Sequence, residues 1–323
     1  MKATMPIFLL LLILVAAVIG MPAPAHAWGG GIHLQIGLNV LENLSLLPAG
    51  IAAILAAHPR VYLYGCIAAD IIVGKKYTHY LLNCHRWRIG QKVLRAARTD
   101  SERACAYGYL SHLAADTISH NYYVPYKTMR SFASVTMKHA YWEMRFETFV
   151  EKQVWEEVRA VCRTDQRPND ALLRSVLTAT LFSFGTNKRI FNSIMLLSRL
   201  ERWQRVMHTL SSNSRYVLAD SDRDEYLKLT EAAVIDFLQH PEESDLLQLD
   251  PTGERALAMA EAFRKNLRLL YKSGRLTKSE GMDQVEALRE KLRRALLEPK
   301  LLEQLHSGKR SIFSVVFGGN TRQ

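Results

Sequence analysis

The chain has 323 residues, of which 48% are hydrophobic and 23% are charged, and its formal net charge is +11 at pH 7. A chain of this length and apolar content can bury a substantial core, which argues against an extended, disordered protein. The alternating pattern of strands is scarce, so we expect an all-α, multi-helix bundle. The basic charge favours a polyanionic partner, but it does not distinguish phospholipid from nucleic acid.

The first 27 residues are typical of a signal peptide. The apolar run 7–19 is shorter than the roughly 20 residues that a membrane span needs. It is followed by Ala25-His26-Ala27, which has the small-x-small pattern of a cleavage site. We predict cleavage between Ala27 and Trp28, with export to the periplasm or the medium; an uncleaved anchor is the alternative. Cleavage removes one lysine and no acidic residue, so the net charge becomes +10.

Cleavage would make Trp28 the first residue of the mature protein. Its free α-amine and its carbonyl oxygen could chelate a metal ion in a five-membered ring. His33 lies five residues further on, after three glycines that let the backbone fold tightly around an ion. The alternative is a flexible spacer that happens to contain a histidine.

Two apolar segments come next. Residues 32–57 have the pattern of an amphipathic helix interrupted near Pro48. In 62–72, Asp70 follows small residues, and Gly65 would permit a close approach of another element. A carboxylate at this position could bind a metal or could cap a helix.

Two histidine–carboxylate stripes follow. His112, Asp116 and His120 are four residues apart within a helix expected from about 100 to 121, so they would share one face. His139 and Glu143 repeat this spacing in a second helix. Imidazole and carboxylate groups suit zinc, and two facing stripes are what a metal site in a helical bundle requires. The alternative for each stripe is an ordinary polar pair.

The residues around these stripes favour a metal over an ion pair. Lys and Arg are absent between Tyr107 and Tyr126, and a carboxylate buried in such apolar sequence needs a cation. We expect Pro125 to end the first helix and the second helix to run over 138–161, with Glu147 and Glu151 facing solvent.

The second half is also helical by pattern. We divide the chain into a catalytic zinc-binding core at 28–165, a helical part of the same domain or a subdomain at 166–306, and a loosely ordered tail at 307–323. The basic segments 261–278 and 284–298 could rest on anionic lipid or could simply be solvated. Disulfides or thiolate zinc ligation are open for the four cysteines, Cys66, Cys84, Cys105 and Cys162.

This ordered set of residues resembles the zinc-dependent phospholipase C family over roughly 28–157, and the single-strand-specific zinc nucleases share the ligand order. The resemblance implies an all-helical fold that holds three zinc ions. The implied ligands are Asp70, His85, His112 and Asp116 for one zinc; the Trp28 amine and carbonyl, His33 and a bridging Asp116 for the second; and His120, His139 and Glu143 for the third.

The chain departs from the family pattern at three places. The histidine of the third zinc usually follows the aspartate by six residues, where this chain has Tyr122, and we take His120 instead. We prefer His85 to His79 because its spacing from Asp70 matches the nuclease branch. The glycine triplet lacks the acidic residue that helps to hold choline in the best-known phospholipases.

The resemblance implies a secreted zinc-dependent phosphodiesterase. The leading hypothesis is a phospholipase C that hydrolyses the glycerol-side phosphate ester of phospholipids by metal-activated water, with Asp70 orienting or deprotonating that water. One alternative is a single-strand nuclease on the same site, and another is a non-catalytic exported metal-binding or membrane-associated helical protein. Phospholipid, a membrane surface and nucleic acid are the candidate partners. Aromatic residues that could stack bases in a nuclease are Tyr122, Tyr123, Tyr126 and Trp142.

Overall fold

The computed structural model describes residues 29–72, 83–134, 139–178, 180, 182–200, 203–205, 209 and 218–297, without the side chains of 139, 140, 144 and 297. Within these residues the secondary structure is helical and contains no strand, which confirms the all-α prediction. The predicted signal peptide, Trp28, His79 and the C-terminal tail lie outside the described residues.

The helices of the first half surround one long central helix. They are α2 (Gly30–Glu42), η1 (Leu44–Leu46), α3 (Ala49–Ala57), α4 (Pro59–Ala68), η2 (Ala69–Ile71), α5 (Trp87–Ala96) and the central α6 (Asp100–Ile118). The remaining elements are η5 (Ser119–Tyr123), α7 (Val124–Arg130), α8 (His139–Glu147), α9 (Lys152–Arg163), α10 (Arg167–Val176), α11 (Phe184–Ser198), α13 (Asp220–Gln239), η6 (Asp245–Gln248), α14 (Glu254–Lys272) and α15 (Lys278–Leu297).

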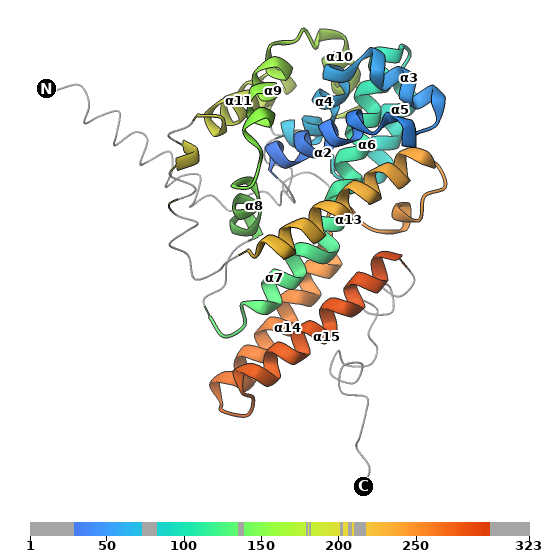
Figure 1. Cartoon of the computed structure of the whole chain (residues 1–323). Coiled ribbons are helices and arrows are strands. Elements are labelled where there is room, and N and C mark those ends of the chain that lie inside the picture. Colours follow the sequence, from blue (N-terminus) through green and yellow to red (C-terminus); the bar gives the residue numbers. More distant parts are fainter. Residues whose placement is uncertain are drawn as a thin grey trace, which may run out of the picture.

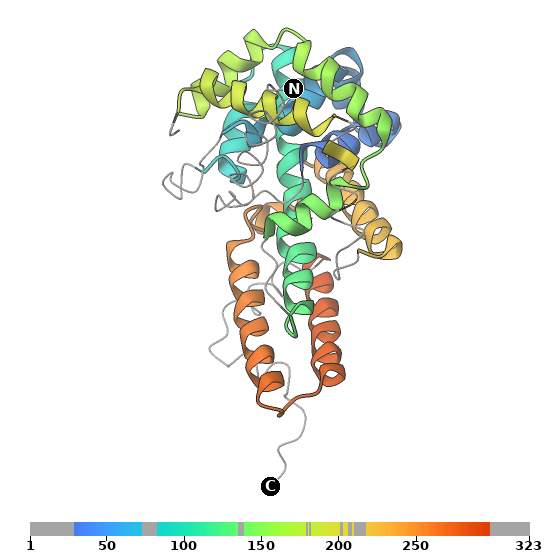
Figure 2. The same ribbon diagram turned by 90° about the vertical axis from the view of Figure 1, so that its left-hand side faces the viewer.

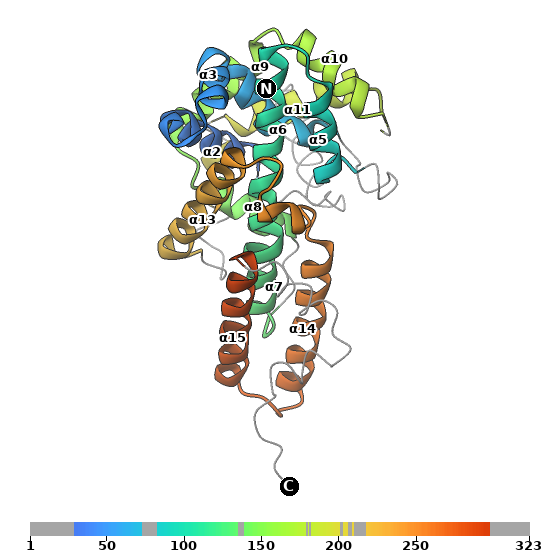
Figure 3. The same cartoon turned by 90° about the vertical axis from the view of Figure 1, so that its right-hand side faces the viewer.

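The helices form a body with a projecting arm (Figure 1). The body contains α2 to α6 and α9 to α11, and α13 packs along α6 and α2. The arm consists of α7, α14 and α15, and it extends away from the body in both side views (Figures 2 and 3). The predicted division near residue 165 falls between α9 and α10, and α10 packs back on α5 and α6.

Helix α6 is the centre of the body because it is buried on nearly every side. Thr99 and Glu102 start it with a reciprocal capping box, in which each side chain satisfies a backbone N–H of the first turn. From Ala104 to Ile118, every residue except Tyr107 is buried. A helix that is buried in this way must have other helices packed against it along its whole length.

Two glycines set the contact between α4 and α6. A Cβ atom on Gly108 would lie 2.1 Å from the carbonyl oxygen of Tyr62, and one on Gly65 would lie 2.2 Å from that of Cys105. Both obstacles are backbone atoms, so neither could move without separating the two helices. This close crossing places the C-terminal end of α4, and Asp70 just beyond it, against α6.

Pro125 does not end the central helix, so that prediction was wrong. Helix α6 continues through the π-helical turn η5 into α7, and the N–H of Val124 donates to the carbonyl oxygen of Ser119. Proline has no backbone N–H to donate, so it is tolerated at the start of a helical segment. Pro125 lies at such a position, where the wider π turn returns to α-helical spacing. The Asn121 side chain supplies a further donor to the carbonyl oxygen of Thr117, at 2.9 Å.

The helix expected over 138–161 is instead two helices, α8 and α9, with a break at 148–151. The Thr148 hydroxyl donates to the carbonyl oxygen of Arg145 at 2.7 Å, and such a side-chain bond competes with the helical ladder. The N–H of Glu151 donates to the Gln35 side chain of α2 at 3.3 Å. Contacts to α2 therefore replace part of the helical bonding that a continuous helix would have made.

The four cysteines form no disulfide with one another. Cys66 and Cys105 are fully enclosed between α4 and α6, and burial raises the pKa of the Cys66 thiol to about 12. These two thiols therefore act as small core side chains.

No single helix in the described part of the chain is long and apolar enough to span a membrane. One pair, α3 followed by Pro59–Ile71, reaches the required length and composition together, but it is bent by 96°. The second member of this pair is buried against α6 and ends at the Asp70 turn.

The glycine crossing gives a testable prediction. Gly108→Ala should lower the free energy of unfolding by about 2–3 kcal/mol, because the added methyl group forces α4 and α6 apart. Gly50→Ala is the matched control: Gly50 lies in α3 with open space around it, so alanine should raise stability by up to about 1 kcal/mol. Urea unfolding followed by circular dichroism measures both. Equal stability of the two variants would contradict the crossing.

Candidate metal centre

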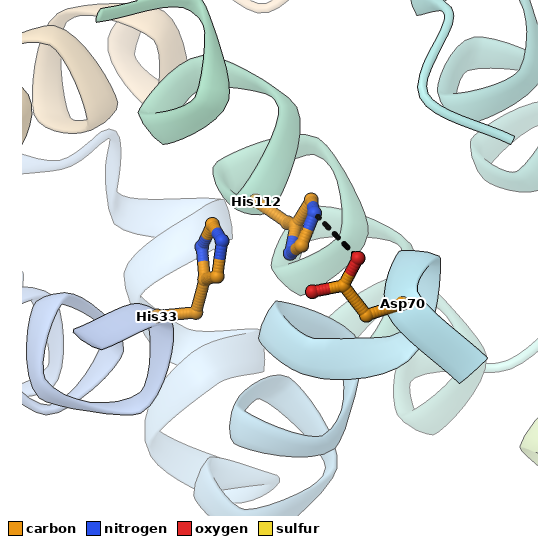
Figure 4. Close-up of side chains that lie close together, drawn as sticks. All are labelled: His33, Asp70 and His112. Atoms are coloured by element: carbon orange, nitrogen blue, oxygen red, sulfur yellow. Dashed lines mark ion pairs between the residues drawn. The ribbon is translucent and has the colours of Figure 1, made fainter. Parts of the chain in front are cut away.

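Three helices bring polar side chains to one buried point. His33 comes from the start of α2, Asp70 from η2 and His112 from the middle of α6, and the three side chains converge in Figure 4. The Nε2 atom of His112 lies 4.0 Å from Oδ1 of Asp70. The His33 and His112 rings are stacked, with centroids 3.8 Å apart. All three residues are buried.

Asp116 lies one helical turn after His112 and is fully buried. Its Oδ1 is 3.3 Å from Nε2 of His33, while its Oδ2 is 3.3 Å from Nε2 of His112 and 3.5 Å from Nε2 of His85. Neither carboxylate oxygen makes a hydrogen bond of acceptable geometry within the described residues. The two oxygens of Asp116 thus face two different groups of imidazole nitrogens.

His85 completes the first group from the turn before α5. Its Nε2 lies 3.1 Å from Oδ1 of Asp70 and 3.1 Å from Nε2 of His112. The turn is fixed because Asn83 accepts the N–H of His85 at 2.9 Å and Tyr109 donates its hydroxyl to the Cys84 carbonyl oxygen at 2.6 Å. The His85 ring is therefore held with Nε2 toward Asp70 and Asp116.

Backbone carbonyl groups orient two of the imidazole rings. Nδ1 of His112 lies 2.9 Å from the carbonyl oxygen of Cys66, and Nδ1 of His120 lies 2.5 Å from that of Pro251. A carbonyl oxygen can only accept, so each Nδ1 carries the proton. In neutral rings the Nε2 lone pair is then available to a cation, which is the usual arrangement of metal-binding histidines.

A second cluster forms at the π turn. His120 lies in η5, where Glu143 of α8 interacts with it, and Asp116 contributes a further negative charge. The loop after η6 closes over His120: Gly253 has a φ of +58°, and a Cβ there would lie 2.4 Å from Cβ of His120. Asn121 donates to the carbonyl oxygen of Asp250 in the same loop, at 2.9 Å.

The choice of His120 rather than Tyr122 as the metal ligand stays a prediction, but the two side chains have different surroundings. Tyr122 is buried elsewhere, and its hydroxyl donates to Glu225 of α13 at 3.0 Å. Since His120 interacts with Glu143, it is the residue that could act beside Glu143 in a third ion site.

The charges in the centre act on one another strongly. Burial and the neighbouring His112 lower the pKa of His33. Burial also disfavours the charged form of His112, but the Asp116 and Asp70 carboxylates outweigh it and raise the pKa of that imidazole. Burial opposes ionisation of Asp116 as well, yet His112 and His33 hold its pKa well below the ordinary range. Asp116 is therefore a carboxylate.

The donor set fits a metal cation. His33, Asp70 and His112 offer ligand atoms that all lie within 4.8 Å of one another, and so do His85, His112 and Asp116. A buried carboxylate such as Asp116 is costly unless a cation offsets it, and imidazole with carboxylate is a zinc-type donor set.

Residues 32–184 match the profile of the family described as zinc dependent phospholipase C. This part of the chain is therefore similar to the zinc-dependent phospholipase C family. The resemblance inferred from the motif residues is thereby confirmed. Comparison with curated proteins and with solved structures gives no match. The family match supports a zinc-dependent hydrolase that acts on phosphodiesters.

The structure thus gathers most of the predicted metal ligands, although their binding of metal stays a prediction. Gathered side chains are His33, Asp70, His85, His112, Asp116, His120 and Glu143. Trp28 lies outside the described residues, as does His79, which competed with His85. His139 begins α8, but its side chain is not described.

The sequence did not indicate the contribution of Asp250–Gly253 to the site. The Pro-Thr-Gly sequence signals a turn, but nothing local indicates that the turn packs on His120 about 130 residues earlier. The packing supplies both the Nδ1 acceptor and the steric fit for that ring.

Glu147 was expected to face solvent, and this expectation was wrong, whereas Glu151 is exposed. The Glu147 carboxylate turns to the start of α2, where Oε1 accepts the N–H of Gly31 at 2.8 Å and Oε2 is buried. A Cβ on Gly29 would lie 1.8 Å from Oε1. The glycine run is therefore packed against α8 in its described part, and its lack of side chains lets Glu147 reach the backbone before His33.

Burial, with the nearby Asp70 and Glu143 carboxylates, raises the pKa of Glu147 to about 7. The folded protein then keeps a proton that the unfolded chain releases near the ordinary value of 4.5. For metal-free protein, Glu147 should lower the free energy of unfolding by about 1–3 kcal/mol as the pH rises from 4.5 to 7.

Glu147→Gln keeps an acceptor for Gly31 but cannot ionise, so it should remove this part of the pH dependence. Urea unfolding at several pH values in the presence of a chelator measures the difference between wild type and variant. Glu151→Gln is the control, because Glu151 is exposed and should leave the pH profile unchanged. Parallel profiles for wild type and Glu147→Gln would contradict the burial of this carboxylate.

Proposed function

We propose that the protein is an exported zinc-dependent phospholipase C that hydrolyses the glycerol-side phosphate ester of phospholipids. The observation that carries the proposal is the position of Asp116, whose two oxygens face His33 on one side and His85 with His112 on the other. Adjacent cation sites sharing a carboxylate suit displacement at phosphorus. The family match supports the same reaction class.

The gathered residues, together with Trp28 and His139, would hold three zinc ions. Asp70, His85, His112 and Asp116 would bind one ion; Trp28, His33 and Asp116 the second; and His120, His139 and Glu143 the third. When bound, zinc supplies Lewis acidity that lowers the pKa of water and offsets negative charge developing on the phosphoryl oxygens.

The protein's own groups would orient the reaction. Asp70 is buried at the edge of the first group, with one oxygen 3.1 Å from Nε2 of His85, and it is our candidate to orient the attacking water and accept its proton. The carbonyl groups of Cys66 and Pro251 keep the His112 and His120 rings in fixed orientations. Products would be diacylglycerol and a phosphorylated head group.

The aromatic residues do not favour the nuclease alternative. Tyr122, Tyr123, Tyr126 and Trp142 are all buried, with exposed fractions of at most 3%. Stacking of bases requires an exposed aromatic face. These four side chains are core residues, so their aromatic rings pack inside the protein and are not available to stack bases.

Export is part of the same proposal because cleavage after Ala27 would create the Trp28 amine. The described part of the glycine run is already packed against α8, as Gly31 and Glu147 show. A packed run would hold a new N-terminus near His33. Amino-terminal sequencing of the secreted protein should begin at Trp28.

The proposal is tested by assaying hydrolysis of phosphatidylcholine, anionic phospholipids and single-stranded nucleic acid in parallel. We expect diacylglycerol release from phospholipid, and Asp70→Asn should lower kcat at least about 100-fold because it removes a proton acceptor and a ligand. His240→Asn is the control, since His240 is exposed at the end of α13. Cleavage of nucleic acid alone, or full activity of Asp70→Asn, would overturn the proposal.

A further inference from the structure

The arm ends in a tip, defined as residues Leu269–Lys278, where α14 turns into α15. The tip forms the lower extremity of the described arm in all three ribbon views (Figures 1 to 3). It contains the end of α14, a turn in which Gly274 has a φ of +71°, and the first residue of α15. The metal centre lies in the body, so the tip is a separate surface.

The tip carries cations that the protein does not neutralise. Lys272, Arg275 and Lys278 are exposed, and none of them forms an ion pair within the described ranges. From 262 to 279 the chain contains six Lys or Arg residues and no acidic residue. This concentration of one sign of charge on a protruding surface favours an anionic partner.

The tip also exposes apolar surface. Leu269 is 67% exposed, more than any other large hydrophobic residue in the described chain, and Tyr271 is 37% exposed. A single exposed leucine is ordinary, but Leu269 lies one helical turn before the unpaired Lys272 of α14, so apolar and cationic groups share this end of the arm. Both kinds of group gain from a partner that offers negative charge and an apolar interior.

The tip is held in place by contacts along the arm. The Tyr271 ring packs edge-on against Phe132 after α7, with centroids 5.9 Å apart. Arg264 and Arg268 donate to Ser131 or Ser134 in the same segment. The apolar and basic side chains are thus presented on a braced pair of helices.

We infer that the tip docks the protein on anionic phospholipid membranes, with Leu269 entering the headgroup–acyl boundary and Lys272, Arg275 and Lys278 contacting lipid phosphates. Cationic residues beside Leu and aromatic side chains are typical of interfacial attachment. A nucleic acid or an acidic protein could satisfy the charge, but neither would account for the exposed Leu269 at a convex extremity.

Docking would keep the enzyme at a surface that is rich in substrate. This role rests on the proposed function, whereas membrane binding by the tip does not. Since the tip is separate from the metal centre, it should affect access to membrane lipid rather than chemistry. The KM for vesicle lipid should therefore depend on the tip, whereas kcat and the hydrolysis of a soluble short-chain phosphodiester should not.

The test is co-sedimentation of the mature protein with vesicles of phosphatidylcholine alone or mixed with phosphatidylglycerol. Binding should require phosphatidylglycerol and fall as salt rises. Replacing Lys272, Arg275 and Lys278 together by Gln should weaken binding roughly 100-fold, at about fivefold per cation. Leu269→Ser should weaken it about tenfold by removing an apolar anchor.

Matched controls separate the tip from general charge and apolarity. Arg88, Lys92 and Arg95 are exposed on one face of α5 without an ion pair in the described structure, so their triple Gln variant changes the charge equally. Leu46→Ser removes a half-exposed leucine from the body. Both controls should bind vesicles as wild type does.

The outcomes distinguish docking from catalysis. Loss of vesicle binding in tip variants alone, with soluble-substrate hydrolysis intact, would support the inference. Equal loss in the α5 triple variant, binding of nucleic acid but not vesicles, or binding of vesicles without dependence on the tip would overturn it. Failure of the proposed function would appear instead as absent hydrolysis with tip-dependent binding preserved.

Discussion

A fully buried carboxylate whose ion-pair partners in the described structure are histidines is the constraint on which this structure depends. Asp116 lies inside the central helix α6, and imidazole nitrogens approach both of its oxygens. Burial of such a charge is costly unless a positive charge offsets it, and neutral histidines do so only partly. A shared pair of metal ions would satisfy both oxygens and bind the histidines through nitrogens already turned toward the carboxylate.

The surrounding fold can be understood as the means of bringing distant residues to Asp116. Glycines at the α4–α6 crossing allow Asp70 to reach the central helix, and the π turn carries His120 to the Glu143 side while the chain continues into the arm. Gly253 and Pro251 then close on His120 from a loop more than 100 residues later. The glycine crossing, the π turn and the loop at Pro251–Gly253 are all backbone features. The site therefore depends on packing geometry as much as on the identity of its ligands.

The all-α class and most of the gathered side chains could be predicted because they depend on local rules. Four-residue spacing identifies a shared helical face, and the absence of basic residues near His112 and Asp116 indicated a buried cation site. The errors arose where tertiary contacts override local preference. Pro125 was tolerated because a π turn precedes it, and Glu147 was drawn inward by the backbone of α2. The sequence around Glu147 does not contain its backbone partner, and helical spacing alone does not distinguish a π turn from an ordinary helical turn before Pro125.

The most direct test of the metal centre is the zinc content of the mature, signal-cleaved protein, measured by elemental mass spectrometry beside an Asp116→Ala variant and a form extended by one residue before Trp28. The account predicts close to three zinc ions per chain in the native protein and fewer in both altered forms, because one loses the bridging carboxylate and the other loses the terminal amine. Absence of stoichiometric metal from every form would contradict it and would leave His112, Asp116 and their neighbours as buried polar pairs.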